Sequence, residues 1–304
     1  MSENSEQPNS SNTEREIEKV EINMQYHLYL PFFSFIYFGS YMIPGIICML
    51  YILLFFKPYF LDQPNFIFLF TDLNSLLAFL SFPMVIIACY VLHLFFIGLI
   101  TRLLWRFTER MSPTKSGIIL RNVPSDTLNY YHIRSFIIKY GKNVFTKGMF
   151  PWLANWYFNF VGSNKIGKGT TIEEEIVADK FIDIGDNCYI GVNSAICSHV
   201  VEGIFGRIPY FEVKLGDNVT CAAFNIVGPG SDLKDNSYLL PLGALGKHQV
   251  TKGNNYYFGL PARKIFRRKI MEFLKLTQED LDRDKELSIK QQEKKSLKIN
   301  GVGV

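Results

Sequence analysis

The chain has 304 residues, 48% of them hydrophobic, and its 32 basic and 28 acidic residues leave a net charge of +4. This length allows about two domains with a hydrophobic core that is stable without disulfides or structural metals, which excludes disorder as the overall state. Five cysteines, an odd number spread over a long chain, exclude a disulfide framework. The balanced charge gives no reason to expect nucleic acid as a partner. These averages hide the distribution, because many of the 27 Phe and 16 Tyr residues lie in the first third of the chain.

Residues 1–26 form a leader rich in Ser, Asn and Glu, which predicts a disordered polar tail. This leader also argues against a secretory signal. The apolar run that follows it is too long for a signal peptide, and neither a basic segment nor a small-residue cleavage site flanks it.

Two uncharged runs predict a transmembrane helical hairpin over residues 27–106. The first extends from Leu28 to Phe56 and the second from Leu73 to Thr101. Each exceeds the length of about 20 apolar residues that a helix needs to cross a hydrocarbon core. A pair of buried helices in a soluble protein remains the alternative.

The basic residues predict the orientation of this hairpin. Nine Lys and Arg side chains follow the second run between Arg102 and Lys147, whereas the loop between the runs contains Lys57 alone. Positive residues mark the cytoplasmic side of a membrane. We therefore expect an integral membrane protein in contact with lipid, with two spans and with the amino terminus and everything after the second span in the cytoplasm.

Residues 107–158 mix basic and aromatic side chains, which predicts a linker at the membrane interface. The pattern leaves two interpretations of its aromatic residues open: an interfacial belt at headgroup level, or a cap on the domain that follows. The residues concerned are Trp152, Trp156, Tyr157 and Phe158.

A six-residue period dominates residues 159–265. Aliphatic or small residues recur in two series that differ in phase by one position, and Gly or Asp-Asn pairs often follow them. A helix would show spacings of three and four and a hairpin strand a spacing of two, so the pattern predicts a solenoid of short strands with one inward side chain per repeat and Gly or Asn at the corners. The two series are Phe160, Ile166, Ile172, Ala178, Ile184, Ile190, Ile196 and Leu215, Cys221, Val227, Leu233, Leu239, Leu245.

The motifs KIGKGTTI, IDIGDNCYIGVNSAI, KLGDNVTCAAFNIV and YYFGLPARKI resemble the hexapeptide-repeat acyltransferase superfamily over about half of the chain. The resemblance implies a left-handed parallel β-helix, triangular in section, that assembles as a homotrimer. Together with the upstream helices, the sequence is similar to the membrane-attached repeat domains at the carboxyl end of nonribosomal peptide synthetases that make polyamino acids. The fold expected is thus a membrane-anchored all-β domain, with two helices before it and a charged helical tail, 266–304, after it.

The two series change phase between Ile196 and Leu215, where we expect an irregular segment. The residues SHVVEG at its start include His199 and Glu202. In the family a single His beside such a loop is the general base of acyl transfer, and His199 matches it; a structural hydrogen-bonding role is the alternative. Glu202 is expected to orient this imidazole or to contact substrate, with a solvated carboxylate as the alternative.

The resemblance also implies contacts with coenzyme A. The family's closing motif lies beside the pantetheine arm of acyl-CoA, and small residues earlier in the solenoid let the arm approach, although ordinary solenoid packing explains the same residues. Leu260 departs from the motif, because many members carry Asn or Ser there. The candidate contacts are Ala222, Gly243, Gly259, Pro261, Ala262, Arg263 and Lys264.

These observations predict a membrane-anchored acyltransferase that uses acyl-CoA, such as acetyl-CoA, and needs no metal. The acceptor is a hydroxyl or amine of a small molecule, glycan, lipid or peptide. A noncatalytic scaffold that uses the solenoid for assembly or docking is the alternative. A zinc enzyme of the gamma carbonic anhydrase type is a weaker one, since it needs three His ligands and only His199 and His248 follow Lys147.

Overall fold

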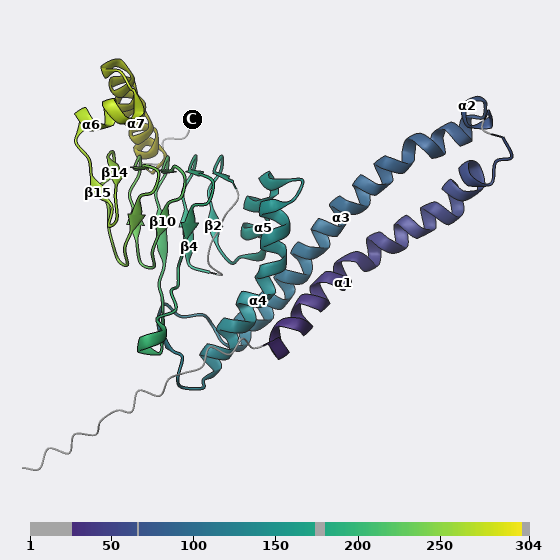
Figure 1. Cartoon of the computed structure of the whole chain (residues 1–304), viewed down its shortest axis with the longest axis horizontal. Coiled ribbons are helices and arrows are strands. Elements are labelled where there is room, and N and C mark those ends of the chain that lie inside the picture. The colour runs from purple at the N-terminus through teal and green to yellow at the C-terminus, as the bar shows by residue number, and fades with distance from the viewer. Residues whose placement is uncertain (1–25, 66, 174–179, 300–304) are drawn as a thin grey trace, which may run out of the picture.

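The computed structural model describes residues 26–65, 67–173 and 180–299, so the expected polar tail lies almost wholly outside the described residues. A long helical hairpin, further helices packed against its base, a β solenoid and two carboxyl-terminal helices follow one another along the molecule (Figure 1). The solenoid and the far end of the hairpin lie at opposite ends of this elongated shape.

The hairpin consists of α1 (Tyr26–Tyr51), continued by the π-helical turns of η1 (Ile52–Leu61), then α2 (Phe68–Thr71) and α3 (Leu73–Met111). Asp72 caps α3 by accepting a hydrogen bond from the backbone N–H of Ser75. Both long helices are apolar enough to cross a membrane. Most of their large apolar side chains are exposed rather than packed in a core, which favours the membrane interpretation over a buried helix pair.

Residues 107–158 are more ordered than a linker. They contain the end of α3, β1 (Gly117–Leu120), α4 (Asp126–Lys147), η2 (Pro151–Leu153) and the start of α5 (Ala154–Val161). Helix α4 packs on both α1 and α3 because its buried residues recur at helical spacing. These buried residues are Leu128, Tyr131, Arg134, Ile137, Ile138, Gly141, Phe145 and Thr146.

The four aromatic residues for which a membrane belt or a domain cap was predicted do not all have the same environment. Tyr157 and Phe158 are fully buried and continue the solenoid core, so they belong to a cap. Trp152 is 68% exposed and Trp156 stacks on Phe160 at 4.9 Å. Phe160 itself belongs to α5, so it is not the inward residue of a coil as its six-residue spacing predicted.

The solenoid has three parallel sheets that run along its length, as the hexapeptide period predicts. Lys214 pairs with Asp232, and Ile226 with Ala244, so neighbouring coils are offset by three hexapeptides. The strands are β2 (Lys165–Ile166), β3 (Thr171–Ile172), β4 (Ile182–Ile184), β5 (Tyr189–Ile190), β6 (Ala195–Ile196), β8 (Val213–Leu215), β9 (Thr220–Cys221), β10 (Ile226–Val227), β11 (Asp232–Leu233), β12 (Tyr238–Leu239), β13 (Ala244–Leu245) and β14 (Tyr256–Phe258).

The marker residues form the predicted inner column. From Ile166 to Leu245 each described marker is buried, while Ala178 lies outside the described residues. The parallel β-helix is therefore seen directly; its left-handed winding and its assembly as a trimer stay predictions.

The corners follow the same period. Gly169, Asn187, Asn218 and Asn236 have positive φ, as predicted for residues that tolerate the left-handed region. Four other corners are occupied by bulkier residues, at a cost of about 1–2 kcal/mol each that the stacked coils must offset. These are Phe181, Phe224, Leu242 and His248.

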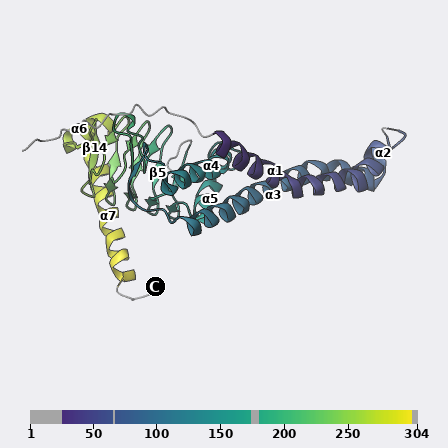
Figure 2. The same cartoon turned by 90° about the horizontal axis from the view of Figure 1, so that it is seen from below.

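The predicted helical tail consists of two helices, α6 (Arg267–Leu274) and α7 (Gln278–Ile299). Lys275 adopts a left-handed conformation with φ 52° and ends α6. Thr277 and Asp280 then cap each other, because the backbone N–H of each donates to the side chain of the other. Helix α7 projects away from the solenoid (Figure 2).

Candidate functional site

The phase break is an extruded hairpin. Its two strands are joined by bridges from His199 to Tyr210 and from Glu202 to Arg207, and η3 (Gly203–Phe205) forms the tip. The returning strand, β7 (Arg207–Tyr210), pairs antiparallel with β1 in the segment before α4. The irregular segment predicted from the spacing is thus tied to the helical part of the protein.

His199 packs between two aromatic rings. Its imidazole makes edge contacts with Tyr131 of α4 at 5.4 Å and with Tyr210 of β7 at 5.9 Å between ring centroids. Both tyrosines are buried in a small cluster with Ile119 and Ile208, while His199 is only half-buried. The packing fixes the orientation of a ring that keeps part of its surface accessible.

Glu202 acts as a clamp on the hairpin. Its Oε2 accepts a hydrogen bond from Nε of Arg207 at 2.5 Å, and its Oε1 pairs with Nζ of Lys247 on a later coil. The side chain is only 12% exposed. These contacts argue against the alternative of a solvated carboxylate for Glu202, and they hold the hairpin against the solenoid.

Sequence reasoning did not single out His248 as part of this region. Its exposed ring lies 4.5 Å from that of Phe211, which directly follows β7. The ring also lies over Gly230, where a Cβ atom would come within 2.3 Å of Nδ1. The six-residue spacing of the corners was the available signal, because it places His248 one coil after Gly230. Within the described residues no group of three His, Cys, Asp or Glu side chains could hold a metal ion.

The closing turn, residues 259–262, brings several predicted coenzyme A contacts together. The backbone N–H of Ala244, which follows Gly243, donates to the carbonyl of Gly259 at 2.9 Å, and that of Ala262 donates to the carbonyl of Ala244 at 2.6 Å. Ala262 is buried, and Pro261 is exposed. The turn leads into β15 (Arg263–Lys264), an antiparallel partner of β14 whose two side chains are both exposed.

Ala222 lies one coil earlier than Gly243, next to Ala223, whose carbonyl accepts a hydrogen bond from the N–H of Leu242. Both alanines are half-buried. Ala222 and Gly243 therefore lie on neighbouring coils; Gly243 is buried, and contact of these residues with a pantetheine arm stays a prediction.

Residues 247–249, which we call the bridging corner, connect the hairpin with the closing turn. Lys247 pairs with Glu202, His248 packs on Phe211, and Nε2 of Gln249 donates to the carbonyl of Ala262 at 2.5 Å. The two sets of residues singled out from the sequence thus meet through one corner of the solenoid.

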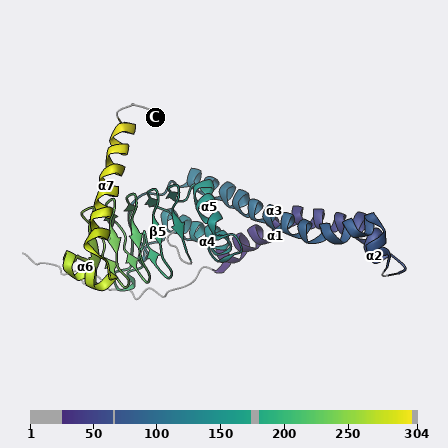
Figure 3. The same cartoon turned by 90° about the horizontal axis from the view of Figure 1, so that it is seen from above.

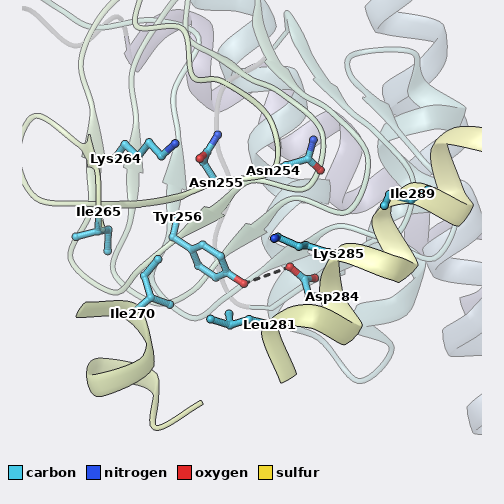
Figure 4. Close-up of a pocket in the computed structure, with 10 residues that line it drawn as sticks. All are labelled: Asn254, Asn255, Tyr256, Lys264, Ile265, Ile270, Leu281, Asp284, Lys285 and Ile289. Atoms are coloured by element: carbon cyan, nitrogen blue, oxygen red, sulfur yellow. Dashed lines mark hydrogen bonds between the residues drawn. The ribbon is translucent and has the colours of Figure 1, made fainter. Parts of the chain in front are cut away.

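Lys264 also lines a cavity of about 370 Å³ between the last strands and α7 (Figure 4). Polar groups face it from β14, where the Tyr256 hydroxyl lies 3.3 Å from Oδ2 of Asp284. Ile270 and Leu281 supply an apolar side. The hydrogen bond between Tyr256 and Asp284 joins α7 to the closing end of the solenoid across this cavity.

Another surface of the solenoid is an exposed apolar ladder, formed by Phe224, Leu242 and Leu260. Phe224 and Leu242 occupy corners with positive φ on neighbouring coils, and Leu260 lies in the closing turn. Their side chains are 54%, 67% and 82% exposed. At the tip of the hairpin, Ile204 and Phe205 are exposed as well.

No protein-family model matches the chain, and no curated protein matches it. Among solved structures, it is similar to a maltose O-acetyltransferase from Clostridium difficile 630, with 23% identity, a TM-score of 0.30, and coverage of 35% of this chain and 59% of that one. A galactoside acetyltransferase in complex with coenzyme A gives 24% identity, a TM-score of 0.28, and coverage of 35% and 56%. A hexapeptide-repeat-containing acetyltransferase from Vibrio cholerae O1 biovar eltor, complexed with acetyl coenzyme A, gives 17%, 0.32, and coverage of 35% and 61%. The chain spans less than two thirds of the length of each of these proteins.

Proposed function

We propose that this protein is a membrane-anchored acyltransferase, which moves an acyl group from acyl-CoA to a hydroxyl or amine near the cytoplasmic face of a membrane. The observation that carries the proposal is the bridging corner. A catalytic base and a thioester site must lie close together, and Lys247 and Gln249 attach the hairpin that holds His199 to the closing turn that would hold coenzyme A.

In this proposal His199 is the general base. It takes the proton from the acceptor O–H or N–H as the acceptor oxygen or nitrogen attacks the thioester carbonyl. The tetrahedral intermediate then collapses with cleavage of the C–S bond, and the leaving thiolate receives the proton from the imidazolium. Imidazole suits this exchange near neutral pH. Tyr131 and Tyr210 hold the His199 ring in place. Glu202 holds the extruded hairpin in position and takes no part in the proton transfer.

The closing turn is the proposed site for coenzyme A. Gly259 is partly exposed and Pro261 is exposed, so a narrow pantetheine arm would lie against these two residues, while the buried Gly243 and Ala262 support the turn from inside. The exposed cations Arg263 and Lys264 are available to its phosphates. Acetyl-CoA is the co-substrate that the motif resemblance implies.

The test is transfer from acetyl-CoA by the full-length protein in detergent, followed as release of free coenzyme A thiol with a panel of alcohol and amine acceptors. We expect His199→Ala to lower the rate by about 10²- to 10⁴-fold, the usual contribution of general acid–base catalysis. His132→Ala is the matched control, because His132 also packs on Tyr131 but lies on α4 outside the hairpin. Full activity of His199→Ala, with unchanged circular dichroism, would contradict the assignment.

A noncatalytic scaffold is the second candidate, and the apolar ladder favours it. Phe224, Leu242 and Leu260 form an exposed column that suits self-association, including the homotrimer implied by the resemblance. Light scattering in detergent tests assembly, with Leu242→Asp expected to yield monomers. Assembly through the ladder without any saturable binding of acyl-CoA would support the scaffold over the enzyme.

A further inference from the structure

The helical hairpin has a covered part and a bare part. Helix α4 covers α1 from Tyr29, whose ring lies 5.0 Å from that of Phe136, to Tyr37, whose ring lies 5.5 Å from that of Tyr140. The ring of Tyr41, one turn further along α1, lies 5.2 Å from that of Tyr37. On α3 the covered part reaches Tyr90, whose ring lies 5.9 Å from that of Phe150. Beyond this level α1 and α3 project alone from the rest of the protein (Figures 1 and 3).

The bare part matches the thickness of a membrane. From Leu73 to Tyr90, α3 has about 18 residues, or about 27 Å at 1.5 Å per residue. The hydrocarbon core of a bilayer is about 30 Å thick. Tyrosine and tryptophan concentrate at membrane interfaces, so the level of Tyr41, Tyr90 and Tyr140 marks the membrane surface. This placement rests on the membrane anchoring in the proposed function.

A cavity of about 650 Å³ lies at this level, between the end of α4, η2 and the first coils of the solenoid. Its lining includes Trp152, whose ring lies 5.2 Å from that of Phe150 and which is therefore near the surface level set by Tyr90. The solenoid contributes Thr171 and Glu173. The cavity thus faces both the membrane surface and the β-helix.

The lining groups favour an uncharged ligand that is rich in hydroxyls. Lys147 supplies a cation and Glu173 a carboxylate, so their charges balance. The carboxyl end of α4 adds carbonyl acceptors and a partial negative charge, which disfavours a phosphate. Thr171 is a hydroxyl that both donates and accepts. The exposed indole of Trp152 offers a flat apolar face. A sugar ring has hydroxyls for both roles and an apolar C–H face for the indole.

We infer that this cavity binds the glycosyl headgroup of a membrane glycolipid. The bound headgroup would hold the first coils of the solenoid at the membrane surface, and Trp152 and Glu173 would select it over a phospholipid headgroup.

Native mass spectrometry of the full-length protein in a polyoxyethylene detergent tests this inference. The probes are a monoglycosyl diacylglycerol, a phosphatidylglycerol with the same chains, and the free methyl glycoside. We expect one glycolipid per chain, bound about tenfold more tightly than the phosphatidylglycerol, with the free glycoside weaker than the glycolipid. Trp152→Ala should weaken glycolipid binding about tenfold, the effect of removing one well-placed contact.

Phe107→Ala is the control, because Phe107 is an equally exposed aromatic residue of α3 that does not line the cavity. Equal binding of the two lipids, a preference for phosphatidylglycerol, or the same loss in both variants would overturn the inference. The acetyl-CoA assay separates this failure from that of the proposed function, since Trp152→Ala should leave transfer to a water-soluble acceptor unchanged.

Discussion

A charge placed in the bare part of the helical hairpin distinguishes a membrane span from an exposed helix of a soluble protein. Leu80 of α3 is 56% exposed and lies near the middle of the bare part. In a soluble protein, Leu80→Arg would change the free energy of unfolding by about 0.5 kcal/mol or less. In a membrane, Arg at the centre of a helix costs about 2.5–3.5 kcal/mol on insertion scales, which lowers the insertion constant by about 60- to 300-fold.

Leu103→Arg is the matched control. Leu103 belongs to the same helix and is 60% exposed, but it lies beyond Tyr90 on the side of the solenoid. Insertion of the full-length chain into microsomes is measured with a glycosylation acceptor site in the connection between the two spans. We expect efficient glycosylation for the wild type and Leu103→Arg, and a loss for Leu80→Arg. Equal behaviour of both variants would refute the membrane placement, and an acceptor glycosylated only after the second span would refute the orientation.

Two further predictions concern buried ionisable groups. Burial raises the pKa of Glu109, but hydrogen bonds from Lys180 and Thr114 and the charge of Arg134 outweigh it and hold the pKa below its usual value. This stabilisation is present above the unfolded pKa of about 4.3 and is lost as pH falls through the lower folded pKa. The Tm should therefore fall once the pH is lowered beyond about 4.3. The variant Glu109→Gln should be less stable than the wild type at pH 7, and this difference in stability should shrink as the pH is lowered. A difference that is constant with pH would contradict this. Burial also raises the pKa of Cys188 to about 11 and of Cys221 to about 12. Iodoacetamide at pH 8 should therefore modify both thiols only after denaturation, as measured by peptide mass spectrometry. Rapid modification of the native protein would contradict this and show that the solenoid core opens.

The solenoid could be predicted because its determinants are local and repeat. Every sixth residue faces the axis, so Leu215, Val227 and Leu239 mark the coils by spacing alone. The two apolar helices could also be predicted from the sequence, since an uncharged run is a property of a continuous segment. The break of the charged tail was predictable in part, because Thr277 and Asp280 form a recognisable helix start. The end of α6 at Lys275 was not, since Lys has no preference for the left-handed region.

Long-range pairings were not predictable. The hairpin after β6 pairs with β1, a strand far away in the sequence, and its alternation is too short to name a partner. Helix α4 lies in a segment whose interleaved basic and aromatic side chains predict a linker at the membrane interface. Its buried Arg134 pairs with Glu109 at 3.0 Å, a contact that only the tertiary fold creates. The ion pair of Glu202 with Lys247 could not be predicted for the same reason. It attaches the hairpin to a later coil, a contact that differs from the predicted one with the imidazole or with substrate.

The most direct test of the proposed function is binding of acetyl-CoA to the full-length protein in detergent, measured by isothermal titration calorimetry. We expect saturable binding of one acetyl-CoA per chain. Binding should weaken when Arg263 and Lys264 are both replaced by Gln, because these exposed side chains are the proposed phosphate contacts. No saturable binding of acetyl-CoA or longer acyl-CoAs by folded protein would contradict the claim that this solenoid is an acyltransferase.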